Sequence, residues 1–269
     1  MEINRTNIFE IINKAGLKPD KDYGQNFLVE PQICERIVES LYLKSDDTVI
    51  EVGPGLGSLT HFLAQAKCKA TAVDVDKRMI DFLRIVYKDS NVEIEENDIR
   101  KTDVSEYNKV VGNLPYNITT ETIQYFLLNA KSAERMVFMI QSETFNHFYD
   151  IEGKEYGPTS VLIHLLGNID KLFVVKAGSF HPIPKCNSTV FAIDIDTRVN
   201  RFSAIEAFKV AKQLFANRRK TISNNLCGLL KNKDTVNKLC VDLKINPMSR
   251  PEQLKPEIYL AISEYLKGK

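Results

Sequence analysis

The chain has 269 residues, of which 43% are hydrophobic, and its formal net charge is +1, which indicates an ordinary globular protein with one α/β domain and a smaller companion. No run of about 18 apolar residues occurs and the chain does not begin with a long apolar stretch, so the sequence excludes a hydrophobic membrane span and predicts an unanchored cytoplasmic protein. Five Cys and four His lie far apart, which argues against a disulfide framework and a metal site.

The first predicted elements form a βαβ unit: a strand over 48–52, a glycine-rich turn over 53–57, a helix over 58–67 and a strand over 69–76. The alternation continues with a helix over 77–88, strands over 92–98 and 108–115, and a helix over 119–130. This order favours a doubly wound, mainly parallel α/β sheet.

The second half begins with a strand over 137–141, a helix containing 143–148, a loop over 151–158, a helix over 159–167, and strands over 171–177 and 188–196. Beyond Asp196 the segment 203–231 and those after it show helical periodicity, with breaks expected near Gly228, Pro247, Pro251 and Pro256. We therefore predict an α/β domain over 1–196 and a small helical domain over 197–269.

Charge is distributed unevenly along the chain. Residues 201–250 contain 11 Lys or Arg and 3 Asp or Glu, which leaves 25 basic and 32 acidic residues elsewhere. This excess of positive charge suggests that residues 201–250 bind a polyanion, and the alternative is a helical face that is only solvated.

Three glycines follow the first strand of the βαβ unit. Gly53, Gly55 and Gly57 open the predicted helix, where missing side chains let a ligand approach backbone N–H groups at a positive helix end. Their GxGxG spacing differs from the GxGxxG of dinucleotide sites, and a purely structural turn is the alternative.

Acidic residues end the next two strands. Asp74 lies about 20 residues beyond the glycines, as a ribose ligand should, although Asp76 competes for this role and either residue can instead cap the next helix. At the end of the strand over 92–98, Asp98 can accept from an adenine amino group while the Ile99 backbone N–H meets a ring nitrogen; the alternative is a turn formed by Asn97 and Asp98. Together these strand ends predict a nucleoside pocket.

The tetrapeptide Asn113, Leu114, Pro115, Tyr116 ends the following strand and suits methylation of the adenine amino group. That nitrogen is a poor nucleophile, so acceptors must help it to pyramidalise. The Asn113 side-chain oxygen and the Leu114 carbonyl, restrained by Pro115, can accept both amino hydrogens. Tyr116 can stack on an unpaired base, and Phe180, in a loop stiffened by prolines, can supply the opposite face. The alternatives are a strand-ending turn for the tetrapeptide and a core aromatic for Phe180.

With these motifs the chain resembles the rRNA adenine dimethyltransferases, which comprise the KsgA group and the erythromycin-resistance methyltransferases. The resemblance covers nearly the whole chain and rests on six segments in order: YGQNFL (23–28), IEVGPGLGSLT (50–60), GNLPYNIT (112–119), FHPIPKCNS (180–188), FANRRKTISNNL (215–226) and INPMSRPEQL (245–254). Within the family, NLPY and the RRKT–NNL segment look like the small-subunit enzymes.

The resemblance implies a Rossmann-like class I methyltransferase fold and S-adenosylmethionine as the cofactor. It implies that a segment over 1–30 closes over the cofactor through Gln25, Asn26 and Leu28, and that Gly53, Asp74, Asp98 and Asn113 contact the cofactor. It also implies dimethylation of two adjacent adenosines in a hairpin loop near the 3′ end of 16S rRNA, in an assembling small subunit, by a monomeric enzyme.

The sequence departs from the family pattern at a few positions. Asp74 stands where the family usually has Glu, and Ser142 stands where it has Lys. His147 and Pro158 each stand where the family has Arg, and Lys21-Asp22 stands where it has two basic residues.

Arg218, Arg219 and Lys220 lie on a predicted helix, and we expect some of them to contact RNA phosphates while others pair internally. Three other functions remain open: a resistance-type enzyme acting on large-subunit rRNA, a ribosome-assembly or nucleic-acid-binding factor without catalysis, and a DNA adenine methyltransferase.

Overall fold

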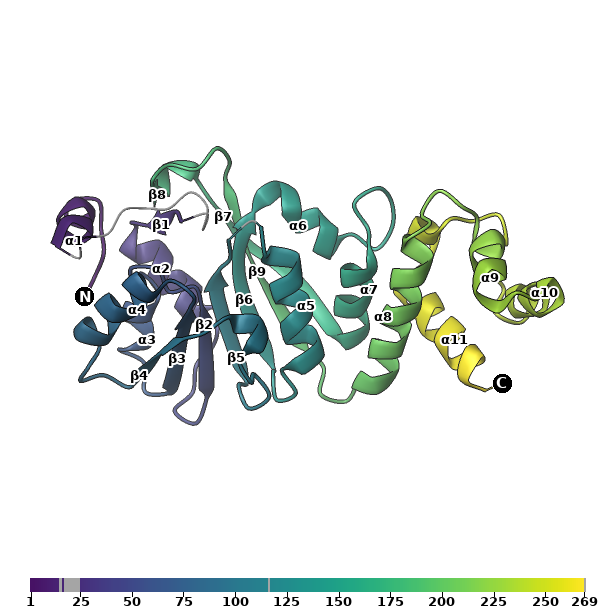
Figure 1. The fold of residues 1–269 in the computed structure, drawn as a ribbon, viewed down its shortest axis with the longest axis horizontal. Helices are drawn as coiled ribbons and strands as arrows, with labels where there is room; N and C mark the ends of the chain where they lie inside the picture. The colour runs from purple at the N-terminus through teal and green to yellow at the C-terminus, as the bar shows by residue number, and fades with distance from the viewer. Residues whose placement is uncertain (15, 17–24, 116, 269) are drawn as a thin grey trace. The chain divides into compact units, whose positions relative to one another are not determined.

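The computed structural model describes residues 1–14, 16, 25–115 and 117–268 (Figure 1). The chain divides into two compact units. The sheet unit comprises 1–143 and 170–194, and the helical unit comprises 144–169 and 195–269. The helical unit thus contains a stretch, 144–169, that lies before the predicted domain boundary at residue 196.

A seven-stranded sheet in the order β4-β3-β2-β5-β6-β9-β7 dominates the sheet unit. Its strands are β2 (Thr48–Val52), β3 (Lys69–Asp74), β4 (Val92–Glu96), β5 (Lys109–Asn113), β6 (Arg135–Gln141), β7 (Gly167–Val175) and β9 (Ser188–Ile195). The pairs from β4 to β6 are parallel, whereas β9 runs antiparallel to β6. The predicted doubly wound, mainly parallel sheet is confirmed.

The strand register brings the predicted site residues to one edge of the sheet. Val52 at the end of β2 pairs with Val73 and Gly112, one residue before Asp74 and Asn113 respectively. The central strands are nearly continuous apolar runs, because helices cover both faces of a sheet of this type. Polar residues at the strand ends therefore gather where the apolar runs stop.

The helices of the sheet unit are α1 (Ile8–Lys14), α2 (Pro31–Glu39), α3 (Thr60–Leu63), α4 (Lys77–Val86) and α5 (Thr119–Asn129), with short 3₁₀ turns η1 (Ile99–Lys101) and η2 (Ala177–Ser179). Helix α4 begins where the Asp76 side chain accepts from the Arg78 backbone N–H, and it buries Met79, Ile80 and Leu83 against β3 and β4. Helix α3 has only four residues, so the predicted helix over 58–67 was too long.

A second, two-stranded sheet joins distant parts of the sequence. Strand β1 (Phe27–Leu28) pairs antiparallel with β8 (Phe180–His181). Neither strand is predictable from periodicity, because two residues are too few to show any.

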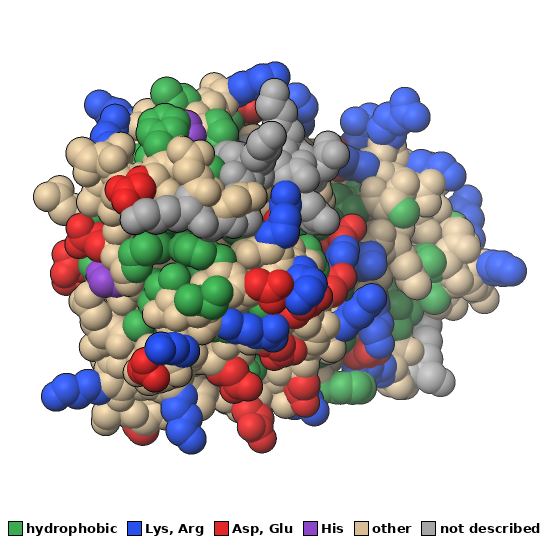
Figure 2. Space-filling view, turned by 60° about the vertical axis from the view of Figure 1, so that its left-hand side comes forward, with side chains coloured by type: hydrophobic (Ala, Val, Ile, Leu, Met, Phe, Trp, Pro, Cys, Tyr) green, Lys and Arg blue, Asp and Glu red, His purple; other side chains and the backbone are tan. Residues whose placement is uncertain are grey.

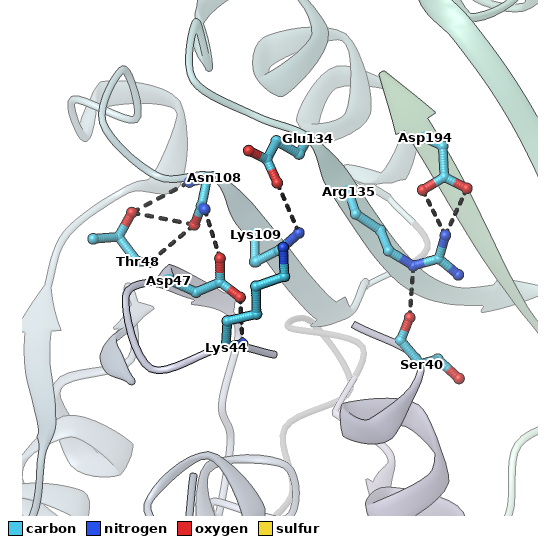
Figure 3. Close-up of polar contacts among 9 residues, drawn as sticks. All are labelled: Ser40, Lys44, Asp47, Thr48, Asn108, Lys109, Glu134, Arg135 and Asp194. Atoms are coloured by element: carbon cyan, nitrogen blue, oxygen red, sulfur yellow. Dashed lines mark hydrogen bonds and ion pairs between the residues drawn. The ribbon is translucent and has the colours of Figure 1, made fainter. Parts of the chain in front are cut away.

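The opposite edge of the large sheet, where the parallel strands begin, carries partly buried polar contacts (Figure 3). Asn108 donates from its side-chain amide to Asp47 at 2.7 Å, and its oxygen accepts from the Thr48 backbone N–H at 2.9 Å. The Lys109 ammonium, on a nearly buried side chain, lies 3.0 Å from Glu134. These contacts satisfy polar groups at the starts of β2 and β5.

The helical unit contains α6 (Ser142–Tyr149, whose first two residues belong to the sheet unit), α7 (Pro158–Leu166), α8 (Arg201–Phe215), α9 (Ile222–Leu230), α10 (Lys233–Asp242), η3 (Pro251–Gln253) and α11 (Pro256–Lys267). Helix α7 packs against α8 and α11, α8 packs against α11, and α9 packs against α10. Their core includes Tyr156, Leu214, Leu226 and Tyr259.

The predicted helical stretch over 203–231 is two helices, and its break lies at 216–221 instead of near Gly228, which is inside α9. The reason is polar capping: the Asn225 amide donates to the carbonyls of Asn217 and Lys220, and the Thr221 hydroxyl caps α9. None of the helices in the described residues is long and apolar enough to cross a membrane.

Candidate active site

A cavity of about 310 Å³ lies at the carboxyl ends of β2, β3, β4 and β5 in the sheet unit. The structure brings together there most of the described residues predicted to bind the cofactor or act in catalysis: Gln25, Asn26, Leu28, Gly53, Gly55, Asp74, Asp98, Ile99, Asn113, Leu114, Pro115 and Phe180. Gly57, the third glycine of the turn, does not line the cavity. Tyr116 lies outside the described residues. In the described part of the chain, no cluster of three His, Cys, Asp or Glu side chains is arranged to hold a metal ion.

The glycine turn follows β2 directly. Gly53 and Gly55 have φ of +65° and +55°, which glycine adopts without strain. A Cβ on Gly55 would lie 3.1 Å from the Phe27 ring, so glycine there lets β1 approach the turn. The turn continues to residue 59 before the four-residue α3 begins, so the predicted positive helix end does not directly follow the glycines.

Asp74 and Asp76 have different surroundings. Asp76 is 4% exposed, caps α4, pairs with the Arg78 guanidinium and accepts from the Gln25 amide at 2.9 Å, and these contacts, above all the one with Arg78, lower its pKa. Asp74 lines the cavity, and burial raises the pKa of its carboxyl. One Asp74 oxygen accepts from the Asp76 backbone N–H at 2.9 Å, which aligns the carboxylate. Of the two, only Asp74 lines the cavity, and its role as the ribose ligand stays a prediction.

Asp98 also lines the cavity, next to Ile99. Its side chain accepts from the Arg100 backbone N–H at 3.0 Å, so it caps η1 as the predicted turn alternative requires. The Arg100 guanidinium pairs with the same carboxylate and holds its pKa below the usual range. Since each carboxylate oxygen has two lone pairs, capping and ligand binding are compatible.

The predicted catalytic turn, residues 113–115, begins at Asn113, the last residue of β5. The Asn113 side-chain amide nitrogen donates a hydrogen bond to the backbone carbonyl of Asn26 at 3.3 Å. This contact uses the nitrogen of the amide and not its oxygen. The Leu114 backbone N–H donates to Met139 in β6 at 3.0 Å, and the Pro115 carbonyl accepts from Thr119 in the first turn of α5. Hydrogen bonds to β6 and α5 thus fix the backbone of Leu114 and Pro115 where it lines the cavity.

Phe180 lies on β8, opposite Leu28 in the register. It lines the cavity, but its side chain is only 3% exposed and packs in the sheet unit's core. The loop of 182–187 that follows has neither helix nor strand. The ring thus packs in the core and also borders the cavity, while its stacking role stays a prediction.

Glu51 is a cavity residue that the sequence reasoning missed. It is 1% exposed on β2, and the Thr60 hydroxyl donates to it at 2.7 Å. Burial raises its pKa to about 8. A carboxylate inside the otherwise apolar strand TVIEV, directly before the glycine turn, was the signal available.

The three predicted RNA-binding cations lie in the helical unit, in the turn between α8 and α9, so placing them on a helix was wrong. The Arg218 guanidinium donates to the Gly153 carbonyl at 2.6 Å and lies 3.5 Å from Glu252. Arg219 and Lys220 are exposed. Of the three cations, Arg218 is thus held by other parts of the helical unit.

Besides Asp74, the structure describes three of the positions that depart from the family pattern, and two of them have polar partners within the chain. Ser142 accepts from the Thr189 hydroxyl at 2.9 Å, His147 lies 3.1 Å from the Glu155 carboxylate, and Pro158 occupies the first turn of α7. None of these three side chains carries a fixed positive charge.

Comparison with known proteins identifies the family. The model of the ribosomal RNA adenine dimethylase family matches residues 16–268. A probable ribosomal RNA small subunit methyltransferase A from Thermococcus kodakarensis is 35% identical over 98% of this chain and 95% of its own length. Ribosomal RNA small subunit methyltransferase A from Malacoplasma penetrans is 34% identical over 93% of this chain and 92% of its own length.

Two solved structures share the fold. A dimethyladenosine transferase from Plasmodium falciparum superposes with a TM-score of 0.74 at 23% identity, covering 90% of this chain and 98% of that one. The 23S rRNA methyltransferase ErmE superposes with a TM-score of 0.70 at 22% identity, covering 90% of this chain and all of that one. The predicted Rossmann-like methyltransferase fold is therefore confirmed, and the chain belongs to the ribosomal RNA adenine dimethylase family.

Proposed function

We propose that this protein transfers methyl groups from S-adenosylmethionine to the exocyclic amino nitrogens of adenines in small-subunit rRNA. The observation that carries the proposal is the position of Asn113, Leu114 and Pro115 on the same cavity as Asp74 and Asp98. Family membership and the names of the relatives support the class of substrate.

The cavity residues fit a nucleoside cofactor with a cationic tail. The Asp74 carboxylate accepts from the ribose hydroxyls, while Asp98 and the Ile99 backbone N–H contact the adenine edge. The buried Glu51 carboxyl lines the same cavity and would hold a positive charge of the bound cofactor, which in turn would favour the ionised form of Glu51. When bound, the cofactor supplies an electrophilic methyl group on a sulfonium. Gln25, Asn26 and Leu28 cover it from the β1 side.

The residues of the catalytic turn act on the target base. The Asn113 oxygen and the Leu114 carbonyl accept the two amino hydrogens, which directs the nitrogen lone pair towards the methyl group. Phe180 and Tyr116 stack on the two faces of an adenine that has left its own stack. The neutral nitrogen would form its bond to the methyl group as the methyl–sulfur bond breaks and leaves a thioether, and the amino proton would then pass to water, so an ionisable base is not required before the attack.

The substrate is a pair of adjacent adenosines in a hairpin loop near the 3′ end of 16S rRNA, in an assembling small subunit in the cytoplasm, and the enzyme acts as a monomer. Figure 2 shows Lys and Arg side chains spread along the right-hand edge of the face that it draws. In the helical unit, the exposed Arg219 and Lys220 contact RNA phosphates, and Arg218 supports them. Such contacts provide affinity, while the loop's shape and unstacked bases provide selectivity.

The test is transfer of labelled methyl from S-adenosylmethionine to separated, unmethylated small and large ribosomal subunits, followed by mapping of the modified nucleosides. Dimethyladenosine in small-subunit rRNA is the expected product. Label confined to large-subunit rRNA would identify a resistance-type enzyme, and label only in duplex DNA would identify a DNA methyltransferase. Binding of the cofactor without transfer of methyl to any of these substrates would point to an assembly or nucleic-acid-binding factor without catalysis.

A further inference from the structure

Arg100 connects the end of β4 to the start of α5. It follows Ile99 in η1, lines the cavity itself, and forms ion pairs with Asp98 and with Glu121 in the first turn of α5, both at 2.8 Å. The order Glu121–Arg100–Asp98 thus joins the helix that follows the catalytic turn to the end of β4.

The contact between Arg100 and Asp98 is side-on. The guanidinium donates from Nε to Oδ1 at 3.0 Å and from Nη2 to Oδ2 at 2.8 Å, while Nη1 donates to Glu121. A two-point contact of this kind fixes the plane of a carboxylate, which a single hydrogen bond does not. Asp98 already caps η1 by accepting a hydrogen bond from the Arg100 backbone N–H, so the guanidinium is not required to begin η1 after β4.

The charges around Arg100 argue against a role as an RNA contact. One guanidinium faces two carboxylates, so its charge is already compensated within the chain. The Lys101 side chain next to it is exposed. The arrangement instead suits a group that orients a hydrogen-bond acceptor.

We propose that Arg100 is a positioning residue for the cofactor's purine subsite: with Glu121 fixing its far end, it holds the Asp98 carboxylate in the orientation that accepts the adenine amino group. This inference rests on the proposed function, since it assumes that Asp98 meets an adenine. Arg100 acts through Asp98 and does not touch the reacting atoms. The same ion pair holds the pKa of the Asp98 carboxyl below its usual range.

The test compares four single variants and one double variant by calorimetry with two probes, S-adenosylhomocysteine and S-inosylhomocysteine, which has an oxo group in place of the adenine amino group. Arg100→Met should weaken S-adenosylhomocysteine binding about three- to tenfold while changing S-inosylhomocysteine binding less than about twofold. Arg100→Lys should recover part of the loss. Lys101→Met, which removes the same charge one residue away, should bind like the wild type.

Glu121→Gln breaks only the far contact and should give a smaller loss than Arg100→Met, and adding it to Arg100→Met should cause little further loss. Steady-state kinetics of Arg100→Met should show a raised KM for S-adenosylmethionine with kcat nearly unchanged. Equal weakening of both probes, or equal effects of Arg100→Met and Lys101→Met, would overturn the proposal. Failure of the wild type to bind either probe would instead overturn the proposed cofactor site.

Discussion

The side-chain amide of Asn113 is joined to the backbone carbonyl of Asn26, 87 residues earlier in the sequence, by a hydrogen bond of 3.3 Å. This contact connects the end of β5 to the segment before β1. It uses the amide nitrogen as the donor, so the amide oxygen is the group that can accept from a substrate. The residue proposed to act on the target base is therefore oriented by the segment proposed to cover the cofactor.

Asn113→Ala should lower the rate of methyl transfer by about 100-fold or more, because it removes an acceptor that matters most in the transition state. Binding of S-adenosylhomocysteine should change less than about threefold. Single-turnover transfer and calorimetry measure the two quantities. Asn129→Ala, at the far end of α5, is the control. Equal losses of rate and of cofactor affinity would contradict the assignment.

Asp74→Ala should raise the cofactor dissociation constant with little effect on folding, because the Asp74 carboxylate faces the cavity. Asp76→Ala should lower the free energy of unfolding by about 1–2 kcal/mol, since it removes the cap of α4 and the contact with Arg78. Calorimetry and urea denaturation of both variants separate the two roles. Unchanged cofactor binding by Asp74→Ala would move the ribose contact to Asp76.

Glu51 should make stability depend on pH. Its pKa is raised from 4.5 to about 8 by burial, so between these values the folded state keeps a proton that the unfolded state releases. The free energy of unfolding should therefore fall as pH rises from about 4.5 to about 8, by at most about 1.4 kcal/mol per pH unit. Urea denaturation of Glu51→Gln across this range should lack that contribution. Parallel profiles for the two proteins would show that Glu51 is already ionised.

Arg219→Ala and Lys220→Ala should each reduce the salt dependence of RNA binding by about one unit of slope, because each removes a phosphate contact. Arg218→Ala should change the slope less but lower the stability of the helical unit, since Arg218 contacts Gly153 and Glu252. Filter binding at several salt concentrations and thermal unfolding measure both effects. Three equal slope changes with unchanged stability would argue that Arg218 contacts RNA as well.

Arg135→Met should destabilise the sheet unit by roughly 1–3 kcal/mol. The guanidinium lies 2.5 Å from both oxygens of Asp194 on β9 and donates to the Ser40 carbonyl at 2.6 Å (Figure 3). Its side chain is 10% exposed, so removal of the charge leaves these acceptors without their donor. Asp194→Asn should cost less, because the partner carboxylate is 41% exposed. Urea denaturation should rank the variants in this order.

Much of the sheet unit was predictable because its strands are long enough to show a pattern. The β2 strand, the glycine turn and Asp74 follow from an apolar run, a cluster of glycines and a carboxylate at a strand end. The parallel register then brings strand ends together whatever the rest of the chain does. This is why predicted cofactor residues from four strands line one cavity.

The parts that were missed depend on contacts between distant residues. The pairing of Phe27 with His181 spans 154 positions and two-residue strands, which carry no periodic signal. The length of α3 and the break before α9 depend on turn and cap contacts, such as those of Asn225, instead of on hydrophobic spacing. The role of Arg100 depends on where Glu121 lies in space.

The helical unit is made from two separate stretches of sequence, with β7 to β9 between them. Helix α7, from the first stretch, has its packing partners α8 and α11 in the second. A truncation after residue 195 would therefore strip α7 of both partners and expose its apolar side chains, giving an aggregation-prone remnant instead of an isolated catalytic domain. During synthesis, this unit can close only when the last helix has emerged. Any exchange of this unit between relatives by recombination needs three matched breakpoints, near residues 143, 169 and 194, so the two units are expected to be inherited together.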